Sequence, residues 1–156
     1  MKKFLLLFLL VFGTQFVQAQ DLVWHTNVKE AIKISEKQKK PLMLFFTGSD
    51  WCGWCIRLQK EVLKTPEFQK WAQNNVVLVE LDFPRRTPQA LEIKQQNNEL
   101  QQAFGIKGFP TVHFAKASTK DGKVNFVGLG SSGYLSGGPA VWLANADEII
   151  KSKNHR

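Results

Sequence analysis

The sequence predicts an α/β layered domain, and three observations support this fold class. The runs "PLMLFF" (41–46) and "VVLVELDF" (76–83) are almost continuously apolar over the length of a strand, which is typical of central strands covered on both faces. Segments with helical spacing of apolar residues lie between and after these runs. Late in the chain, Asp121-Gly122 is a strong hairpin signal between two more strand-like segments. Alternating strands and helices that end in a hairpin indicate helices packed on a sheet.

The first nineteen residues are predicted to be a cleaved secretory signal peptide. Lys2 and Lys3 precede nine apolar residues, and small-residue cleavage positions follow, ending at Ala19. Nine apolar residues are too few to cross a bilayer, which needs about 20. An N-terminal anchor or core helix that is not removed is the alternative. We therefore expect a domain over residues 20–156, exported to the bacterial periplasm, with no cysteine near the cut to carry a lipid.

The domain is predicted to begin with a short edge strand, "LVW" (22–24). A helix over 27–40 follows, because Val28 and Ile32 lie four residues apart and Pro41 closes the segment before the first central strand.

Two helices are predicted between the central strands. The first covers 52–64, where Leu58 and Val62 lie four residues apart. The second covers 65–75, with Thr65 as its N-cap and proline at its first helical position.

The second half is predicted as helix, two strands and helix. A helix after Pro88 stops at Gly105. Strands at 111–116 and 123–130 are joined through 117–122, and the last helix covers 138–153. The residues expected to face inward are Ile93, Leu100 and Phe104 in the first helix and Trp142, Ala146, Ile149 and Ile150 in the second.

The formal net charge is +8, but its distribution does not indicate a nucleic-acid partner. Basic residues are spread over "KQKK", "PRR" and "KSKNHR" and are interleaved with acids and glutamines. A nucleic-acid-binding protein is expected to have a dense basic stripe on a known module. Solvated helix faces explain this pattern better.

The chain has two cysteines, Cys52 and Cys55, in "TGSDWCGWC". A zinc site needs four ligands, and none of the three histidines lies at ligand spacing from another, so we expect no metal. A structural bridge over so short a loop would constrain the unfolded chain little. A redox pair fits best, because Cys52 follows a buried strand and opens a helix, whose free amides and dipole favour a thiolate. Such a pair needs no cofactor, since electrons pass through the sulfurs.

A strand, then "WCGWC" opening a helix, then "GFPT" (108–111) before a hairpin resembles the thioredoxin superfamily. Nearly the whole mature chain takes part, and it looks most similar to exported members such as the C-terminal domain of periplasmic thiol:disulfide interchange proteins. The resemblance implies a thioredoxin fold, with a central mixed β-sheet flanked by helices on both faces. It also implies a cis Phe109-Pro110 bond packed beside the cysteines.

The resemblance also implies roles for the site residues. Cys52 attacks the disulfide of a client protein, Cys55 resolves the mixed disulfide, and Pro110 belongs to the catalytic site. The residues expected to bind the client are Trp51, Gly53, Trp54, Phe109 and Thr111. Packing alone is the alternative role for Trp51.

Two positions depart from the family pattern. Thioredoxins have a buried aspartate six positions before the first cysteine, where this chain has Phe46, and a helix-kinking proline where it has Lys60. The first change leaves Cys55 without the usual proton acceptor. Glu80, a carboxylate in an apolar strand, is the candidate substitute. The alternative is that Glu80 faces solvent or a basic partner.

Two other features are expected to be structural. "GLGSSG" (128–133) satisfies G-x-G-x-x-G but ends a strand instead of opening a helix, so we expect no nucleotide. His113 lies on an apolar strand and is expected to be a packed core histidine.

The sequence therefore predicts an exported thiol:disulfide oxidoreductase that acts on exported proteins with disulfides or thiols. The motif has no histidine, lysine or arginine between its cysteines, and Trp54 adds apolar bulk. Both features favour a reductase or interchange role, supplied by a membrane electron donor, over a strong oxidase. The alternative is a non-catalytic binding module that holds exported polypeptides on Trp51 and Trp54.

Overall fold

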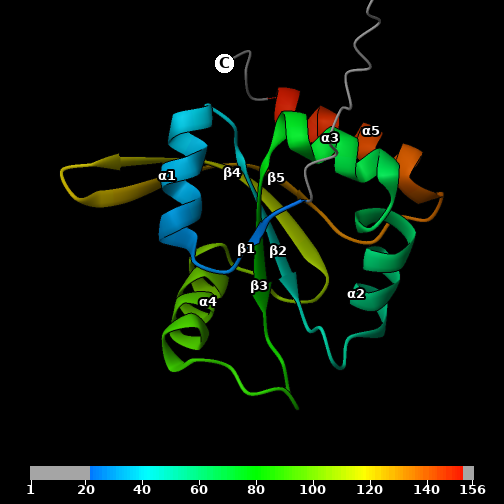
Figure 1. Ribbon diagram of the computed structural model, residues 1–156, viewed down its shortest axis with the longest axis horizontal. Coiled ribbons are helices and arrows are strands. Elements are labelled where there is room, and N and C mark those ends of the chain that lie inside the picture. Colours follow the sequence, from blue (N-terminus) through cyan, green and yellow to red (C-terminus); the bar gives the residue numbers. More distant parts are fainter. Residues whose placement is uncertain (1–21, 153–156) are drawn as a thin grey trace, which may run out of the picture.

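The computed structural model describes residues 22–152 and confirms the α/β class with a central mixed sheet. The elements are β1 (Trp24–His25), α1 (Val28–Gln38), β2 (Leu42–Thr47), α2 (Gly53–Leu58), η1 (Gln59–Leu63), α3 (Pro66–Asn75), β3 (Val77–Asp82), α4 (Leu91–Ala103), β4 (Thr111–Lys120), β5 (Lys123–Ser132) and α5 (Gly138–Ser152). In Figure 1, α1 and α4 lie on one side of the sheet and α2, α3 and α5 lie on the other.

The sheet has the strand order β1-β3-β2-β4-β5. β3 runs parallel to both β1 and β2, whereas β4 pairs antiparallel with β2 and β5 pairs antiparallel with β4. β2 and β3 are in register from Leu42 opposite Val77 to Thr47 opposite Asp82. Both central strands therefore end at the same edge of the sheet, and the cysteine motif follows β2 from that edge.

Successive side chains of β2 and β3 point to opposite faces of the sheet. Met43, Phe45 and Leu78 belong to the core that contains both cysteines and is covered by α2, η1, α3 and α5. Phe46 and Val79 belong to the second core, which is covered by α1 and α4. Each face of the sheet therefore has its own apolar core, which explains the continuous apolar runs of the central strands.

The helix predicted over 52–64 is not uniform. After Leu58, α2 continues as one π-helical segment, η1, in which the Lys64 N–H donates to the Gln59 carbonyl at 2.9 Å. Lys60 lies inside this segment, where the thioredoxin pattern has proline. The missing kink residue is therefore accompanied by a local irregularity in the helix, of a kind often found near functional sites.

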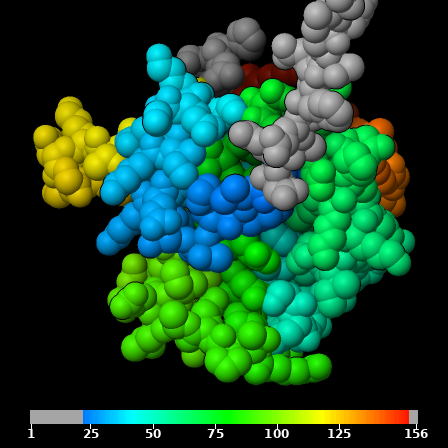
Figure 2. Space-filling view, in the orientation of Figure 1, coloured from blue at the N-terminus to red at the C-terminus, as the bar shows by residue number. Residues whose placement is uncertain are grey.

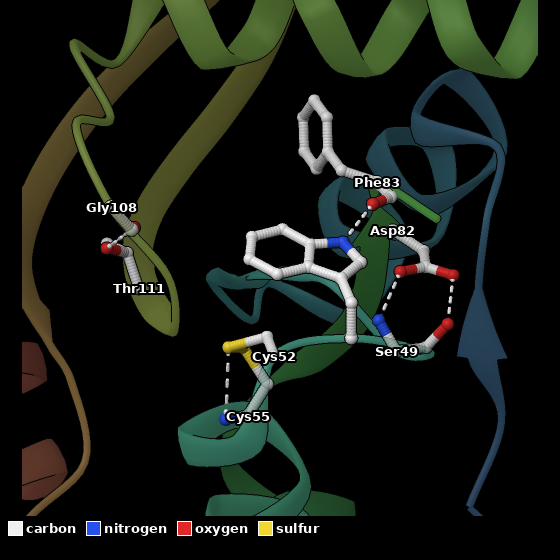
Figure 3. The surroundings of a disulfide bond; sticks show 8 residues. Ser49, Cys52, Cys55, Asp82, Phe83, Gly108 and Thr111 are labelled. Carbon is white, nitrogen blue, oxygen red and sulfur yellow. Dashed lines mark hydrogen bonds between the residues drawn. A yellow bond between two sulfur atoms is a disulfide. The ribbon is translucent and has the colours of Figure 1, made fainter. Parts of the chain in front are cut away.

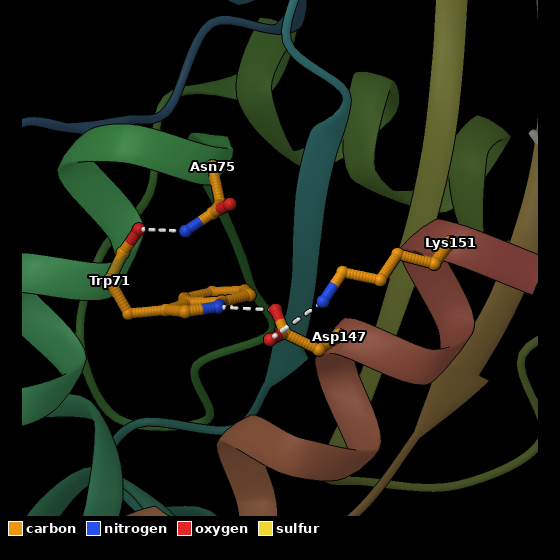
Figure 4. A network of polar contacts seen from close by, with 4 residues as sticks. All are labelled: Trp71, Asn75, Asp147 and Lys151. Carbon is orange, nitrogen blue, oxygen red and sulfur yellow. Dashed lines mark hydrogen bonds and ion pairs between the residues drawn. The ribbon is translucent and has the colours of Figure 1, made fainter.

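Helices α3 and α5 are tied together over the face that holds the cysteines (Figure 4). Trp71 Nε1 donates to Asp147 Oδ1 at 2.8 Å, and Lys151 Nζ lies 3.4 Å from the other oxygen of the same carboxylate. Trp142 and Ala146 of α5 are fully buried, as the helical spacing predicts, and Ile149 and Ile150 pack against the same core.

The C-terminal hairpin is longer than the sequence predicts. Residues 117–120 belong to β4 rather than to a loop, and Asp121 (φ 51°) and Gly122 (φ 73°) alone form the turn. Both turn residues have positive φ, as a two-residue hairpin of this type requires. The hairpin tip, drawn in yellow in Figure 2, projects from the body of the domain.

The glycine-rich run 128–133 lies mostly within β5. A Cβ at Gly128 would lie 3.1 Å from Nε2 of His113, and a Cβ at Gly130 would lie 2.9 Å from Ile149. These glycines therefore leave room for neighbouring side chains. The half-buried His113 ring packs against Phe104, with 4.6 Å between ring centroids, as expected for a packed histidine.

Within residues 22–152, no helix is both long and apolar enough to cross a membrane. The predicted signal peptide, 1–19, lies outside the described residues.

Candidate active site

Cys52 and Cys55 form a disulfide at the start of α2, with 5.2 Å between their Cα atoms (Figure 3). Cys52 is the N-cap of the helix, and its Sγ accepts a hydrogen bond from the Cys55 N–H at 3.2 Å. Cys52 is 6% exposed and Cys55 is completely buried. When the disulfide is reduced, the helix N-terminus favours a thiolate at Cys52, because its unpaired amides and dipole stabilise negative charge.

The loop before Cys52 is fixed to the end of β3. Ser49 donates to both carboxylate oxygens of Asp82, from its N–H at 2.8 Å and from its hydroxyl at 2.6 Å (Figure 3). Trp51 Nε1 donates to the Phe83 carbonyl at 2.8 Å. A Cβ at Gly48 would lie 2.4 Å from the Trp51 ring, so only glycine leaves room for the indole here. These contacts fix the approach of the chain to the first cysteine.

Asp50, the residue between Ser49 and Trp51, binds the loop after β3. Its carboxylate accepts hydrogen bonds from the backbone N–H groups of Arg85 (3.0 Å), Arg86 (2.7 Å) and Thr87 (2.9 Å). These bonds, the one from Arg85 first, lower the pKa of Asp50 to about 2, so the carboxylate is ionised at any pH of interest. Three consecutive residues before Cys52 therefore hold neighbouring segments in place.

The loop before β4 lies against the same residues. The Phe109-Pro110 bond is cis, as the resemblance to thioredoxins implied. The Phe109 ring lies 5.0 Å from that of Phe83 and 6.0 Å from that of Trp51, measured between centroids. The Thr111 hydroxyl donates to the Gly108 carbonyl at 2.7 Å. Aromatic packing thus joins this loop to the residue that precedes Cys52.

Trp54, between the cysteines, is 55% exposed and lies beside Tyr134, with ring centroids 5.1 Å apart. The Arg57 guanidinium lies 5.4 Å from the Trp54 ring and 5.0 Å from the Tyr134 ring. Glu61 holds both neighbours, because it accepts from the Tyr134 hydroxyl at 2.6 Å and from Arg57 Nε at 2.7 Å. The Tyr134 hydrogen bond is the main reason that the pKa of Glu61 is lowered.

Gly53 is exposed, and a Cβ there would meet no atom within 4 Å. The surface beside the disulfide is therefore open at Gly53 and aromatic at Trp54. Trp51 differs from Trp54, because it is half-buried and its indole is committed to Phe83, Phe109 and the core.

Glu80 lies on the face of the sheet that carries the cysteines. Its strand alternates, with Leu78 in the cysteine-side core and Val79 in the other, so Glu80 points to the cysteine side. Glu80 is half-buried, and burial is the main cause that raises its pKa, followed by the nearby charge of Asp82. A half-buried carboxyl with a raised pKa is suited to accepting a proton.

Phe46, six residues before Cys52, does not face the cysteines. Phe46 belongs to the core on the opposite face, whereas Phe45 faces the cysteine side and lies opposite Glu80 in the register of β2 and β3. A carboxylate at position 46 of this chain would therefore point away from Cys55. Phe45 therefore occupies the place on the cysteine side where thioredoxins have the buried aspartate, and Glu80 lies opposite it on the next strand.

Several residues of the site were missed by sequence reasoning. Small polar residues in a loop between a buried strand and a helix need hydrogen-bond partners, and "GSD" before the motif was the available signal. Arg57 and Glu61 follow the motif closely and lie four residues apart, whereas Asp82, Phe83, Arg85 and Tyr134 come from segments distant in sequence and carried no local signal. The missed residues are Gly48, Ser49, Asp50, Arg57, Glu61, Asp82, Phe83, Arg85 and Tyr134.

Across residues 22–152, no three or more histidine, cysteine, aspartate or glutamate side chains come together as potential metal ligands.

The chain matches the thioredoxin-like domain family over residues 28–133. It is 36% identical over 138 residues to the disulfide bond reductase DsbH of Chlamydia pneumoniae, which covers 88% of this chain and 78% of that protein. It is 40% identical over 92 residues to the thioredoxin-related protein DsbJ of the same organism, covering 59% of this chain but 26% of DsbJ.

Solved structures show the same fold. A structure of DsbH oxidoreductase matches with a TM-score of 0.76 and 34% identity, over 90% of this chain and 92% of that one. The oxidised C-terminal domain of DsbD from Neisseria meningitidis matches with a TM-score of 0.51 at 17% identity, over 82% of this chain and 98% of that one, which shows a shared fold alone. With a cysteine pair that forms a disulfide at the start of α2, the chain belongs to the thioredoxin-like family of thiol:disulfide oxidoreductases.

Proposed function

We propose that this protein is an exported reductase or interchange protein that acts on disulfides of other exported proteins. The observation that carries the proposal is the different placement of the two sulfurs. Cys52 caps α2 beside the exposed Gly53 and Trp54, whereas Cys55 is completely buried behind it. This arrangement gives the first sulfur access to a client and reserves the second for resolution.

In the proposed reaction, the Cys52 thiolate attacks one sulfur of a client disulfide. The Cys52–client bond forms, the client S–S bond breaks, and the other client sulfur leaves as a thiolate that takes a proton. Cys55 then loses its proton to Glu80 and attacks Cys52. The Cys52–Cys55 bond forms, the Cys52–client bond breaks, and the second client sulfur leaves as a thiolate that takes a proton, so two electrons have passed to the client. A thiol donor, which we assign to the membrane, must then reduce the enzyme disulfide.

The client segment is proposed to lie between Trp54 and the loop of Pro110. Phe109 and Thr111 flank the proline, and Thr111 begins β4, so an extended client backbone can pair beside it. Trp54 supplies an apolar surface that shields the mixed disulfide from water. Trp51 helps to position the loop of Pro110, since its indole donates to the Phe83 carbonyl and packs against the Phe109 ring.

Two observations support the reductive direction. No histidine lies between the cysteines, and Trp54 fills that position instead, which disfavours the deeply stabilised thiolate of a strong oxidase. DsbH, 36% identical, is named a disulfide bond reductase. Export follows from the predicted signal peptide, so N-terminal sequencing of the secreted protein should begin at Gln20, and retention of residues 1–19 would contradict it.

Trapping tests the assigned roles. Cys55→Ser should accumulate mixed disulfides with clients, because Cys52 still attacks but nothing resolves the bond. Cys52→Ser should trap none. Client adducts formed through Cys55 would reverse the assignment.

A second candidate is a binding module whose disulfide stays closed, and the exposed Trp54 gives it some support. Turnover of insulin disulfides with dithiothreitol separates the two. The proposed reductase catalyses insulin reduction above the uncatalysed rate, and Cys52→Ser abolishes the gain. A wild-type rate equal to that of Cys52→Ser would favour the binding module.

A further inference from the structure

An arginine from a distant loop lies beside the cysteine motif. The Arg85 guanidinium carbon is 3.7 Å from the centroid of the Trp51 ring, and Trp51 directly precedes Cys52. The motif itself has no cation between its cysteines. Arg57, two residues after Cys55, is paired with Glu61 at 2.7 Å. Among the described residues, no carboxylate lies within ion-pairing distance of Arg85, so its charge is not neutralised by a salt bridge.

Both partners of this stack are held in place independently. The Trp51 indole is fixed by its hydrogen bond to the Phe83 carbonyl and by the space left at Gly48. Arg85 is fixed through its backbone, because Asp50 accepts from the N–H groups of Arg85, Arg86 and Thr87. Asp50 itself lies two residues before Cys52. The Asp50 carboxylate therefore holds the loop after β3 in a position that places the Arg85 cation beside the cysteine motif.

We propose that Asp50 and Arg85 act together as positioning residues that stabilise the Cys52 thiolate, with Asp50 holding the loop and Arg85 supplying the charge. The proposal rests on the role of Cys52 as the attacking thiol. Arg85 then supplies the positive charge that is missing between the two cysteines of the motif. A guanidinium on an indole face stays close to the ring because the ring quadrupole attracts it.

Other ionisable groups lie on the elements that carry or flank the motif, and they are unchanged in the test. They are Arg57 of α2, Glu61 of η1, Glu80 and Asp82 of β3 and Tyr134 after β5. Arg57 and Glu61 form an ion pair, the Tyr134 hydroxyl donates to Glu61, and Asp82 is bound to Ser49. Neither Asp50 nor Arg85 is a partner in these contacts, so a change in the Cys52 pKa in their variants reports on the pair.

The first test measures the pKa of Cys52 in the reduced protein from the rate of iodoacetamide alkylation against pH. Arg85→Gln should raise this pKa by about half a unit, the size expected of one partly screened charge. Arg85→Lys, which keeps the charge, should restore most of the shift. In about 1 M KCl the difference should shrink, because the screening length falls to about 3 Å.

Arg86→Gln is the matched control. Arg86 is also exposed, and its backbone N–H also bonds to Asp50, but the cation–ring contact belongs to Arg85. It should move the Cys52 pKa less than Arg85→Gln does. Equal shifts in the two variants, or no shift in either, would overturn the proposal.

Asp50→Asn tests the proposal through the direction in which the pKa of Cys52 moves. By charge alone, removing a carboxylate near Cys52 should lower the pKa of the thiol. If Asp50 acts by holding Arg85 in place, the pKa should instead rise, and in the Arg85→Gln background the same substitution should lower it. A fall in both backgrounds would show that Asp50 does not position Arg85.

The same titration separates this proposal from the proposed function. If the rapidly alkylated cysteine, identified by mass spectrometry, is Cys55, the assigned roles are wrong and the pair has no thiolate to stabilise. If it is Cys52 but its pKa is insensitive to Arg85 and Asp50, the roles stand and the positioning pair is wrong.

Discussion

Trp54→Ala tests the proposed client surface. Trp54 is 55% exposed beside the disulfide, and its remaining contacts are with Tyr134 and Arg57. Because the ring lies mainly at the surface, the substitution should leave the fold intact. It should weaken the binding of a client that covers the indole.

The size of the effect follows from the exposed area. A tryptophan side chain offers about 250 Å², so a client that covers its exposed part, 55% of the residue, buries about 140 Å² and gains about 3.5 kcal/mol at about 25 cal/mol per Å². Ordering of the client segment reduces that gain. We therefore expect a loss of about 1–3 kcal/mol, which is a rise in KM of about 5- to 150-fold. The kcat should change little, since this contact is made equally before and during sulfur exchange.

The assay is insulin reduction with varied insulin and fixed dithiothreitol. Ile56→Ala is the matched control, because Ile56 is 50% exposed but lies two residues further along α2, about 200° around the helix axis. It should leave KM nearly unchanged. An unchanged KM in Trp54→Ala, or an equal rise in Ile56→Ala, would refute the client surface at Trp54.

Three further predictions follow from the structure. Glu80→Gln should slow resolution of the mixed disulfide about tenfold or more in single-turnover experiments. Burial raises the pKa of Glu80, so in the wild type the protonated carboxyl contributes its full share of the folding stability below the unfolded pKa of about 4.3. This contribution is lost as pH rises through the pKa of Glu80 in the folded protein. Urea unfolding of Glu80→Gln should lack that loss, and an unaltered pH profile would contradict the buried placement. Gly48→Ala should destabilise the fold by about 1–3 kcal/mol in urea unfolding, since a Cβ would lie 2.4 Å from the Trp51 ring; wild-type stability would show that the indole is free to move. Trp71→Phe, which removes the 2.8 Å bond to Asp147, should cost about 1 kcal/mol in the same assay while leaving insulin reduction unchanged, and a large loss of activity would count against a purely structural role.

The sequence predicts the framework of the site because its signals are local. Two apolar runs, a cysteine pair at a strand-to-helix junction and "GFPT" before a hairpin are each readable within a few residues. These signals were enough for the α/β class and the order of elements, and the resemblance to thioredoxins that they carry implied the cis bond at Phe109-Pro110. The hairpin was underestimated, because residues 118–120 are polar and exposed, and β4 leaves the core there.

The remaining parts of the site depend on contacts that form only in the folded chain. Asp50 and Arg85 lie 35 residues apart and meet because β2 and β3 end at the same edge of the sheet. Phe46 was assigned by counting across a loop. The face of a strand residue is set by pleat alternation, so an error of one position reverses it. Neither the contact between Asp50 and the loop of Arg85 nor the face of the sheet on which Phe46 lies could be predicted from the motif alone.

The reduction potential of the Cys52–Cys55 disulfide tests the central claim most directly. The purified protein is equilibrated against a series of reduced and oxidised glutathione, and the two redox forms are separated after acid quenching. A reductase or interchange protein should have a potential nearer to that of thioredoxin, about −270 mV, than to that of a strong oxidase, about −120 mV. A potential above about −180 mV, in the range of isomerases and oxidases, would contradict the proposed direction of electron flow.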